Sequence, residues 1–440
     1  MSAVTPPIPT DVGIEGAEPD VIVVGGGLAG LAAATQAARA GAQVVLIEAR
    51  SEPGGRARTD RVDGFGLNQG AHALYRAGAG RAVLRDLGIR PSGGIPRQRG
   101  GAWLVDGRRV TFRHLSEVGG RAGLTALRTI LSRRAAADAE GRSTADWMDD
   151  HVPDEARSVV EALVRTTTYG ADHAHSDAAA VLAQVRLGAQ AVLYLHGGWS
   201  SIVDALHEAA SQAGVVVAHG KVTSVTPDDG AVTVTTGSGV ARARSVVLAA
   251  GGPAQAAALL GSTSPRVSAW AAEARPILAT CLDVALDRVP NRRWSTSYSL
   301  DEPLYLVDHA ATAKVAPEGG GLFHGLWYEP GLTPGIEPRE RLEAALDLVQ
   351  PGWRDHVVAS KHRRTLVVAH DRATPDRPAS VRPTVAVDDA PGVYVAGDWL
   401  TGHGMLADAA LGSAAEAGRL AAGRRHGTEP TSAPRAAVAS

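Results

Sequence analysis

The stretch from Asp20 to Arg50, DVIVVGGGLAGLAAATQAARAGAQVVLIEAR, constrains the fold of this chain more than any other segment. An apolar, β-branched run from Val21 to Val24 predicts a buried strand of a parallel sheet. A glycine-rich turn follows, and then an alanine-rich segment predicts a helix that ends near Gly41. A second apolar run, Gln43 to Ile47, leads to Glu48. The order of strand, helix and strand predicts an α/β fold.

Three glycines in G-x-G-x-x-G spacing form the turn, and each has its own physical role. Gly25 permits the tight turn, the missing side chain of Gly27 lets a pyrophosphate approach the backbone, and Gly30 lets helix and strand pack closely. The helix N-terminus adds unpaired N–H groups and the positive end of a dipole. Glu48 ends the second strand, where its carboxylate can accept hydrogen bonds from ribose hydroxyls. The segment therefore predicts a dinucleotide site rather than an ordinary glycine-rich turn.

The residues after Glu48 indicate which dinucleotide binds. Gly54, Gly55 and Arg56 would place flexible backbone and a guanidinium beside the pyrophosphate, and the planar fork of arginine pairs well with phosphate oxygens. Here the chain resembles the superfamily of flavin amine oxidases, phytoene desaturases and protoporphyrinogen oxidases, whose members carry an acid and then GGR after the first βαβ unit. The resemblance implies non-covalent FAD, with Glu48 on the adenosine ribose and Arg56 near the pyrophosphate.

A second matching segment lies near the other end of the chain. Residues 392–420 predict a buried strand, a turn at Gly397 and Asp398, and a long helix, and they resemble the C-terminal FAD segment of the phytoene desaturase-like group. By that match, Asp398 accepts a hydrogen bond from a ribityl hydroxyl, and the helix N-terminus at residues 404–406 faces the flavin N1/O2 edge. The dipole of that helix would stabilise negative charge arriving there.

The resemblance also implies flavin contacts in the middle of the chain. Residues 64–74 lie where the superfamily brings backbone amides against the flavin, although Asn68 stands where an acid is common. The later strand from Lys221 is expected to pass the adenine. In full, the expected cofactor-binding residues are Gly25, Gly27, Gly30, Glu48, Ala49, Arg50, Gly55, Arg56, Gly70, Ala71, His72, Val222, Gly251, Gly397, Asp398, Gly404, Met405 and Leu406.

The catalytic groups are less clearly indicated. Because imidazole titrates near neutrality, His72, His324 and His403 are candidates for a catalytic acid or base. Some amine oxidases of the superfamily use a lysine beside the flavin N5, but Lys314 lies in a stretch that predicts a loop. Cys281 is the single cysteine, so neither a disulfide framework nor a metal site is expected.

The remaining segments predict a second unit of the fold. Residues 81–194 have mostly helical periodicity, interrupted by a hairpin at 101–112 that turns at Asp106 and Gly107. Residues 263–375 predict strands at 278–286, 304–307, 321–328 and 365–370 and a helix at 339–348. Alternation along 321–329 predicts two opposite faces, one of which should look into a cavity over the flavin. The two sets are Leu322, His324, Leu326 and Tyr328, and Phe323 and Trp327.

The fold class is therefore α/β, with a Rossmann-like FAD-binding domain (GR2-type) and an inserted α+β substrate domain made of a sheet and a helical cap. We expect the FAD domain to comprise residues 18–80, 195–262 and 376–424. The substrate domain would comprise 81–194 and 263–375, and the tails 1–17 and 425–440 would be flexible.

Composition narrows the classes of partner. A net charge of −2 offers no basic field for nucleic acid. No apolar run reaches the roughly eighteen residues of a spanning helix, and the N-terminal tail lacks the pattern of a secretory signal, so a cytoplasmic protein is expected. The basic cluster of Arg128, Arg133 and Arg134 is compatible with a membrane-surface helix, but it is more typical of a solvated face over a core stripe.

Together these features predict an FAD-dependent oxidoreductase that takes a hydride from a largely apolar small molecule and leaves a C=C or C=N bond. Oxygen or another electron acceptor would then reoxidise the flavin. Three alternatives stay open: an amine oxidase that releases peroxide, a flavin-dependent isomerase without net redox change, and a non-catalytic carrier similar to the GDP-dissociation inhibitors. No second G-x-G-x-x-G is present, so no separate NAD(P)H domain is expected.

Overall fold

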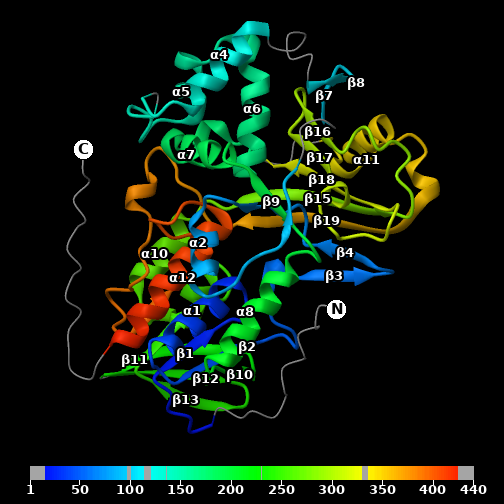
Figure 1. The fold of residues 1–440 in the computed structure, drawn as a ribbon. Coiled ribbons are helices and arrows are strands. Elements are labelled where there is room, and N and C mark those ends of the chain that lie inside the picture. Colours follow the sequence, from blue (N-terminus) through cyan, green and yellow to red (C-terminus); the bar gives the residue numbers. More distant parts are fainter. Residues whose placement is uncertain are drawn as a thin grey trace.

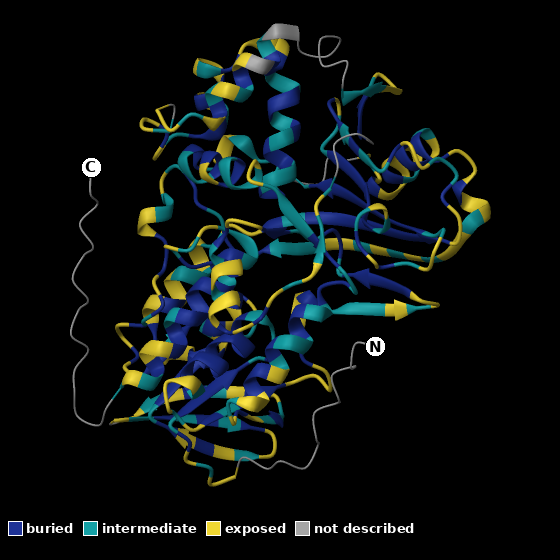
Figure 2. Cartoon of the chain, viewed as in Figure 1, coloured by how far each residue is buried: buried dark blue, intermediate teal, exposed yellow. Residues whose placement is uncertain are grey.

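The computed structural model describes residues 15–96, 101–112, 120–134, 136–228, 230–329 and 335–424. The expected flexible tails lie almost wholly outside these ranges. Two large sheets organise the described residues, and Figure 1 shows a five-stranded sheet in the lower half of the molecule and a seven-stranded sheet above it. Buried residues, dark blue in Figure 2, fill the central strands of both sheets, whereas the two edge strands of the seven-stranded sheet are mostly intermediate or exposed.

The five-stranded sheet is parallel throughout and has the order β10-β2-β1-β14-β20. Its strands are β1 (Val21–Val24), β2 (Val44–Glu48), β10 (Val216–His219), β14 (Ser245–Leu248) and β20 (Val393–Val395). Its helices are α1 (Leu28–Arg39), α8 (Ser200–Gln212) and α12 (Leu406–Gly423). Every residue of β1 is buried, which is why this strand is apolar without alternation. This is the predicted Rossmann-like fold, and the strand–helix–strand unit at 20–50 is confirmed.

Smaller elements surround this sheet. An antiparallel meander follows β10 and consists of β11 (Val222–Asp228), β12 (Ala231–Thr236) and β13 (Gly239–Ala243). The others are β3 (Thr59–Val62), β4 (Phe65–Asn68), β5 (Leu74–Tyr75), α2 (Ala79–Asp86), β6 (Gly93–Gly94), β9 (Val192–Leu195), α9 (Pro253–Leu260) and α10 (Pro265–Glu273).

The seven-stranded sheet has the order β19-β15-β18-β17-β16-β7-β8. Its strands are β7 (Gly101–Val105), β8 (Arg108–Thr111), β15 (Ile277–Leu286), β16 (Thr296–Ser299), β17 (Leu304–Asp308), β18 (Gly321–Tyr328) and β19 (Val357–Ala369). Asp106 and Gly107 both have positive φ, 48° and 67°, as the predicted two-residue hairpin turn requires. The predicted alternation in β18 is confirmed. Phe323 and Trp327 pack with α11 (Pro338–Val349), and Leu322 and Leu326 face the opposite core.

The expected strand at 365–370 is longer than predicted, because β19 already begins at Val357. Its first half contains the run KHRR, which lacks an apolar alternation. The structure explains these charges, since Lys361 pairs with Asp60 and Arg363 pairs with the buried Asp283. Charges that pair with Asp283 on the neighbouring strand and with Asp60 on β3 are compatible with an edge strand, although sequence alone does not show those partners.

The helical cap contains α4 (Gly120–Leu131), α5 (Thr144–His151), α6 (Asp154–Thr168) and α7 (Ala178–Gly188), which share a core of their own. In Figure 1 these helices lie at the upper left, beside the end of the seven-stranded sheet that contains β7. Arg128 is exposed on α4, whereas Ala126 and Ile130 are buried. None of the helices within the described ranges combines the length and the apolar character that crossing a bilayer requires. We propose that the two sheets mark the two discontinuous domains expected from the sequence.

Candidate active site

A cavity of about 590 Å³ opens at the carboxyl ends of the parallel strands. Residues directly after β1, β2, β14 and β20 line one side of it, and residues of β18 and β19 line the other. In open α/β sheets, ligands bind at this edge because the loops that follow the strands converge there. The cavity is therefore the candidate active site.

The glycine turn after β1 forms the base of the cavity. Gly25 has a φ of 102°, and its N–H donates to the Ile47 carbonyl at 2.8 Å. A Cβ atom on Gly30 would lie 1.7 Å from the Gly25 carbonyl oxygen, so this glycine is needed for the helix to pack on the strand. A Cβ atom on Gly27 would meet nothing within 4 Å, so the space beside it is open to a ligand. The backbone geometry at the three positions is compatible with a dinucleotide turn.

A second glycine loop lies directly against the first. The Gly54 N–H donates to the Gly26 carbonyl at 2.7 Å, and Gly27 and Gly54 form a parallel bridge. A Cβ atom on Gly55 would lie 3.5 Å from the Gly27 Cα atom. The GGR segment thus extends the glycine turn into a continuous backbone surface, with the side chains of Arg58 and Val203 against Gly54.

Glu48 is buried at the tip of β2 and is held in place by backbone amides. Its Oε2 accepts from the Gly26 N–H at 2.5 Å and its Oε1 from the Arg50 N–H at 2.8 Å. Each carboxylate oxygen has a further lone pair for a ligand hydroxyl. Ala49, Arg50 and, from β11, Val222 line the cavity beside it.

Asp398 follows β20 and lies at the opposite side of the glycine turn, in a cluster of polar groups. Its Oδ2 lies 2.8 Å from Nη1 of Arg56, and its Oδ1 lies 2.9 Å from Nδ1 of His370. Burial alone would raise the pKa of Asp398, but the Arg56 guanidinium and the His370 hydrogen bond hold it well below the usual range. Asp398 is therefore ionised at neutral pH. Oδ2 of Asp398 forms the ion pair with Arg56 but accepts no hydrogen bond of good geometry. This buried oxygen can therefore accept a hydrogen bond from a ligand.

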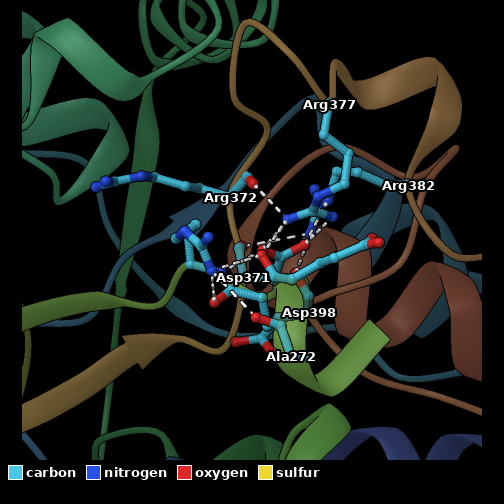
Figure 3. A network of polar contacts seen from close by, with 9 residues as sticks. Ala272, Asp371, Arg372, Arg377, Arg382 and Asp398 are labelled. Atoms are coloured by element: carbon cyan, nitrogen blue, oxygen red, sulfur yellow. Dashed lines mark hydrogen bonds and ion pairs between the residues drawn. The ribbon is translucent and has the colours of Figure 1, made fainter. Parts of the chain in front are cut away.

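A second buried network fixes the segment that carries His370 (Figure 3). Asp371 accepts from Arg377 at 2.6 and 2.9 Å and from Nε of Arg382 at 3.2 Å. Arg382 also donates to the main-chain carbonyl of Asp398 at 3.3 Å. Asp371 follows His370 directly, and it is bound by Arg382. The network therefore fixes His370 beside the Asp398 carboxylate and Arg382 beside the Asp398 main-chain carbonyl. Arg372 continues the network to Asp172 beyond the end of α6.

The three candidate histidines occupy different environments. His72 lines the cavity, and burial lowers its pKa to about 4. Its Nδ1 lies 2.9 Å from the Gly70 carbonyl, which can only accept, so Nδ1 carries the proton and Nε2 has a free lone pair. His324 is wholly buried behind the cavity wall, with Nδ1 2.6 Å from Oδ1 of Asp283. His403 does not line the cavity, and its Nε2 lies 2.8 Å from Glu416 of α12.

The lysines do not supply a group at the apolar side of the cavity. Lys314 is exposed and lies outside the lining, Lys361 pairs with Asp60, and Lys221 lines the cavity beside Gly220 and Val222. Lys221 is therefore near the end where Glu48 lies, since Gly220 N–H donates to the Glu48 carbonyl at 2.8 Å.

Seven cavity residues belong to the core on the inner face of the seven-stranded sheet or pack against it, and we call them the apolar end. They are Ala71, Ala73, Tyr169, Leu326, Leu366, Val368 and Leu406. Tyr169 ends α6 in a left-handed conformation with a φ of 60°, which costs a non-glycine residue about 1 kcal/mol. Behind this wall the hydroxyls of Tyr194 and Tyr305 lie 3.0 Å apart, and burial raises the pKa of Tyr194 to about 12. These phenols remain neutral.

Most of the expected cofactor residues meet at this one cavity. Those that line it are Gly25, Gly27, Glu48, Ala49, Arg50, Gly55, Arg56, Ala71, His72, Val222, Gly251, Gly397, Asp398 and Leu406. Those outside the lining are Gly30, Gly70, Gly404 and Met405. The first turn of α12 reaches the cavity through Leu406 and Ala407, and it is fixed by the Gly80 N–H, which donates to Asp408 at 2.7 Å.

Sequence reasoning missed several lining residues. Arg58 and Gln69 are close in sequence to Arg56 and Gly70, which were expected to bind the cofactor. That proximity could have indicated that they line the cavity. Trp199 and His370 carry no local signal, because the packing of α8 and the end of β19 brings them to the site. The other lining residues that were not anticipated are Val24, Leu28, Ala29, Ile47, Ala57, Ala73, Tyr169, Gly220, Lys221, Ala249, Ala250, Gln255, Leu259, Leu366, Val367, Val368, Ala396, Ala407 and Ala410.

The donor set fits an FAD molecule. Two glycine loops leave backbone space for a pyrophosphate, a fixed glutamate faces one end, and an ionised aspartate with a free acceptor lies on the other side of the turn. The fold and this site define an FAD-dependent oxidoreductase.

The chain belongs to the family of flavin containing amine oxidoreductases, whose family model matches residues 28–280. It is 41% identical over 102 residues to a coproporphyrinogen III oxidase of Propionibacterium freudenreichii, which covers 21% of this chain and 19% of the relative. It is 61% identical over 41 residues to a hydroxyneurosporene desaturase of Cereibacter sphaeroides, covering 9% of this chain and 8% of the relative. The match thus spans about a fifth or less of these relatives' length.

Two solved structures show the fold over almost the whole chain. An oxidoreductase from Methanosarcina mazei superposes with a TM-score of 0.70 at 20% identity and covers 89% of this chain and 98% of its own. A putrescine oxidase bound to putrescine gives a TM-score of 0.67 at 16% identity, with coverage of 92% and 98%. The cofactor of the family is FAD, and this chain has the residues to hold it.

Proposed function

We propose that this FAD-dependent oxidoreductase removes a hydride from a largely apolar, uncharged small molecule and leaves a new C=C or C=N bond. When bound, FAD supplies the hydride acceptor. The observation that supports this substrate class is the apolar end of the cavity, where Tyr169, Leu326 and Leu366 form the wall.

The charges at the cavity support the same substrate class. Within the described residues, no Asp, Glu or Lys belongs to the apolar end, and the nearby acid Asp398 is already paired with Arg56 and His370. An ammonium or carboxylate group buried at this wall would therefore lack an ionic partner, which is costly in a medium of low dielectric constant. A neutral substrate avoids that cost.

His72 is the titratable side chain next to the apolar end, and its pKa suits a hydrogen-bond acceptor better than a base. With a pKa of about 4, the imidazole is neutral at physiological pH and binds a proton weakly. Its Nε2 lone pair can orient an N–H or O–H group of the bound reactants. We therefore propose that His72 positions the reacting groups, and that a dry cavity and alignment supply most of the rate.

The remaining expected residues keep their proposed roles toward FAD. Glu48 would accept from ribose hydroxyls, the glycine loops would admit the pyrophosphate, and Asp398 would accept from a ribityl hydroxyl. The first turn of α12 would face the flavin through its free N–H groups. His324 and His403 receive no catalytic role, because neither lines the cavity.

Anaerobic mixing tests the proposal directly. The yellow protein is mixed with two matched panels, neutral apolar compounds that have an activated C–H bond and small alkylamines, and loss of the oxidised flavin absorbance is recorded. Bleaching by the neutral panel supports the proposal, and bleaching by amines alone identifies an amine oxidase. Isomerised product without net bleaching identifies an isomerase, and a colourless protein that does not bind FAD identifies a carrier. Readmitting oxygen and measuring peroxide then identifies the electron acceptor.

A further inference from the structure

The short segment after β4, residues 69–72, lies between the nucleotide side of the cavity and the apolar end. A Cβ atom on Gly70 would lie 3.0 Å from Sγ of Cys281 and 3.3 Å from Cδ2 of Leu366, so the segment packs directly against the seven-stranded sheet. Gln69 and His72 of this segment both line the cavity. They are the polar side chains that border the apolar end from this side.

The amide of Gln69 has a fixed orientation. Asp60 of β3 lies opposite Leu67 of β4, so Gln69, two residues beyond Leu67, is a diagonal neighbour of Asp60. Nε2 of Gln69 donates to Oδ2 of Asp60 at 3.2 Å. Burial alone would raise the pKa of Asp60, but the hydrogen bond and the charge of Lys361 lower it, so the carboxylate is ionised and only accepts. The amide nitrogen therefore faces Asp60, and Oε1 of Gln69 remains as an acceptor.

Asp60 is itself held by β19. Lys361 pairs with it, and Nη2 of Arg363 lies 3.8 Å from the same oxygen. Arg363 also pairs with the wholly buried Asp283 of β15, which fixes this guanidinium in the sheet. Because β19 continues to Leu366, the same strand that fixes Asp60 also forms part of the apolar end.

His72 supplies a second acceptor. Its Nδ1 proton is directed to the Gly70 carbonyl, and burial lowers its pKa to about 4, so the neutral ring presents the Nε2 lone pair. No described residue donates to this nitrogen or to Oε1 of Gln69, and neither atom is covered by the protein. The neighbouring Trp199 does cover its Nε1 donor, and the Tyr169 hydroxyl is the side-chain donor of the apolar end.

We propose that Gln69 and His72 determine specificity at the apolar end by selecting uncharged substrates that carry an N–H or O–H donor. This inference rests on the proposed function and narrows its substrate class. A substrate without a donor would remove water from two acceptors and leave them unpaired, which is unfavourable. Asp60 is a positioning residue, because it acts through the Gln69 amide.

A matched pair of neutral probes tests the proposal on the FAD-loaded full chain. Indole carries an N–H donor, and 1-methylindole has the same ring with that donor blocked. Binding is followed by the change in the visible absorbance of the flavin, so no turnover is needed. We expect the wild type to bind indole about tenfold more tightly than 1-methylindole, as for one hydrogen bond to an otherwise unpaired acceptor.

Three variants locate the preference. Gln69→Leu and His72→Phe each remove one acceptor, and each should reduce the preference for indole by about threefold while 1-methylindole binds as before. Asp60→Asn removes the charge that orients the amide, and it should reduce the preference without touching the probe. Gln212→Leu makes the matched change on an exposed glutamine of α8 outside the cavity and should keep the preference.

FAD content and thermal unfolding are measured for every variant, and Gln69→Met is a second isosteric change. If both Gln69 variants fold but lose FAD, the acceptor serves the cofactor and the proposal is wrong. Equal binding of the two probes by the wild type, binding of neither, or an unchanged preference in Gln69→Leu would also overturn it. These results leave the hydride-removal function standing. That function fails instead if butylamine alone perturbs the flavin spectrum and bleaches it.

Discussion

The two sides of the cavity are built in opposite ways. The nucleotide side consists of backbone: two glycine loops, hydrogen-bonded at 2.7 Å, with Glu48 fixed by two main-chain amides. The apolar end consists of side chains from β18, β19 and the end of α6, such as Leu326, Leu366 and Tyr169. A backbone site accepts one ligand shape, whereas a side-chain wall can change from protein to protein without disturbing the fold. The nucleotide side is therefore common to proteins of this fold, whereas the apolar end sets which substrate fits.

The largest effect on stability should come from adding a methyl group at Gly30, on the nucleotide side of the cavity. In Gly30→Ala the new Cβ atom would meet the Gly25 carbonyl oxygen at 1.7 Å, so we expect loss of about 3 kcal/mol or more of unfolding free energy. Thermal unfolding of the purified chain measures it. Gly27→Ala is the matched control, since its Cβ atom meets nothing within 4 Å; it should fold normally and lose FAD affinity. Equal stability of the two variants would refute the packing role of Gly30.

Asp398→Asn tests the charged cluster that lies between the two sides. It removes the anion that Arg56 and His370 share, and we expect a loss of about 3 kcal/mol at neutral pH together with a lower FAD content. Because the pKa of Asp398 is depressed in the folded state, its contribution is present above the unfolded pKa of about 3.9 and is lost as pH falls below it. Denaturant titrations of wild type and variant should therefore converge in acid, and a constant difference would contradict this.

The pH dependence of His72 makes the comparison sharper, because this residue borders the apolar end. The unfolded imidazole binds a proton below pH 6.5, whereas the folded one does so only near 4. Stability is therefore lost as pH falls from 6.5 towards 4, by about 3 kcal/mol. His72→Phe should flatten this part of the stability curve in denaturant titrations of the FAD-free chain. An unchanged slope would show that His72 is solvated.

The smallest effect is expected behind the apolar wall. Tyr194→Phe leaves the Tyr305 hydroxyl without its partner at 3.0 Å, and we expect a loss of about 1 kcal/mol with unchanged FAD content. Replacing both tyrosines by phenylalanine should cost less than the sum of the two single changes, which a double-mutant cycle measures. A loss of FAD in Tyr194→Phe would show that the two sides of the cavity are coupled.

Much of the nucleotide side was predictable because its signals are local. The strand at 21–24, the glycine turn and Glu48 fall within one βαβ unit, and the requirements of a glycine turn depend on nearby backbone. The predicted Asp398 turn and the helix after it also have the expected structure. Their roles toward FAD stay proposals.

The side-chain partners were not predictable. His403 has the same type of side chain as His72, but its loop folds back on α12 towards Glu416, and no local pattern indicates that. The alternation in β18 predicted two faces correctly. Which face borders the cavity depends on where α11 packs, and this is a long-range contact.

The sequence by itself determined that a parallel sheet carries a dinucleotide turn. The β-branched runs favour strands, and the glycines permit the tight turn, through the conformation of residues that are close together in the chain. Only the tertiary structure decided which charges meet. Arg56 pairs with Asp398 from a remote segment of the chain, and Asp398 in turn contacts His370. Pairing of this kind depends on how the sheets are brought together, since a guanidinium interacts strongly only with the groups that surround it at close range.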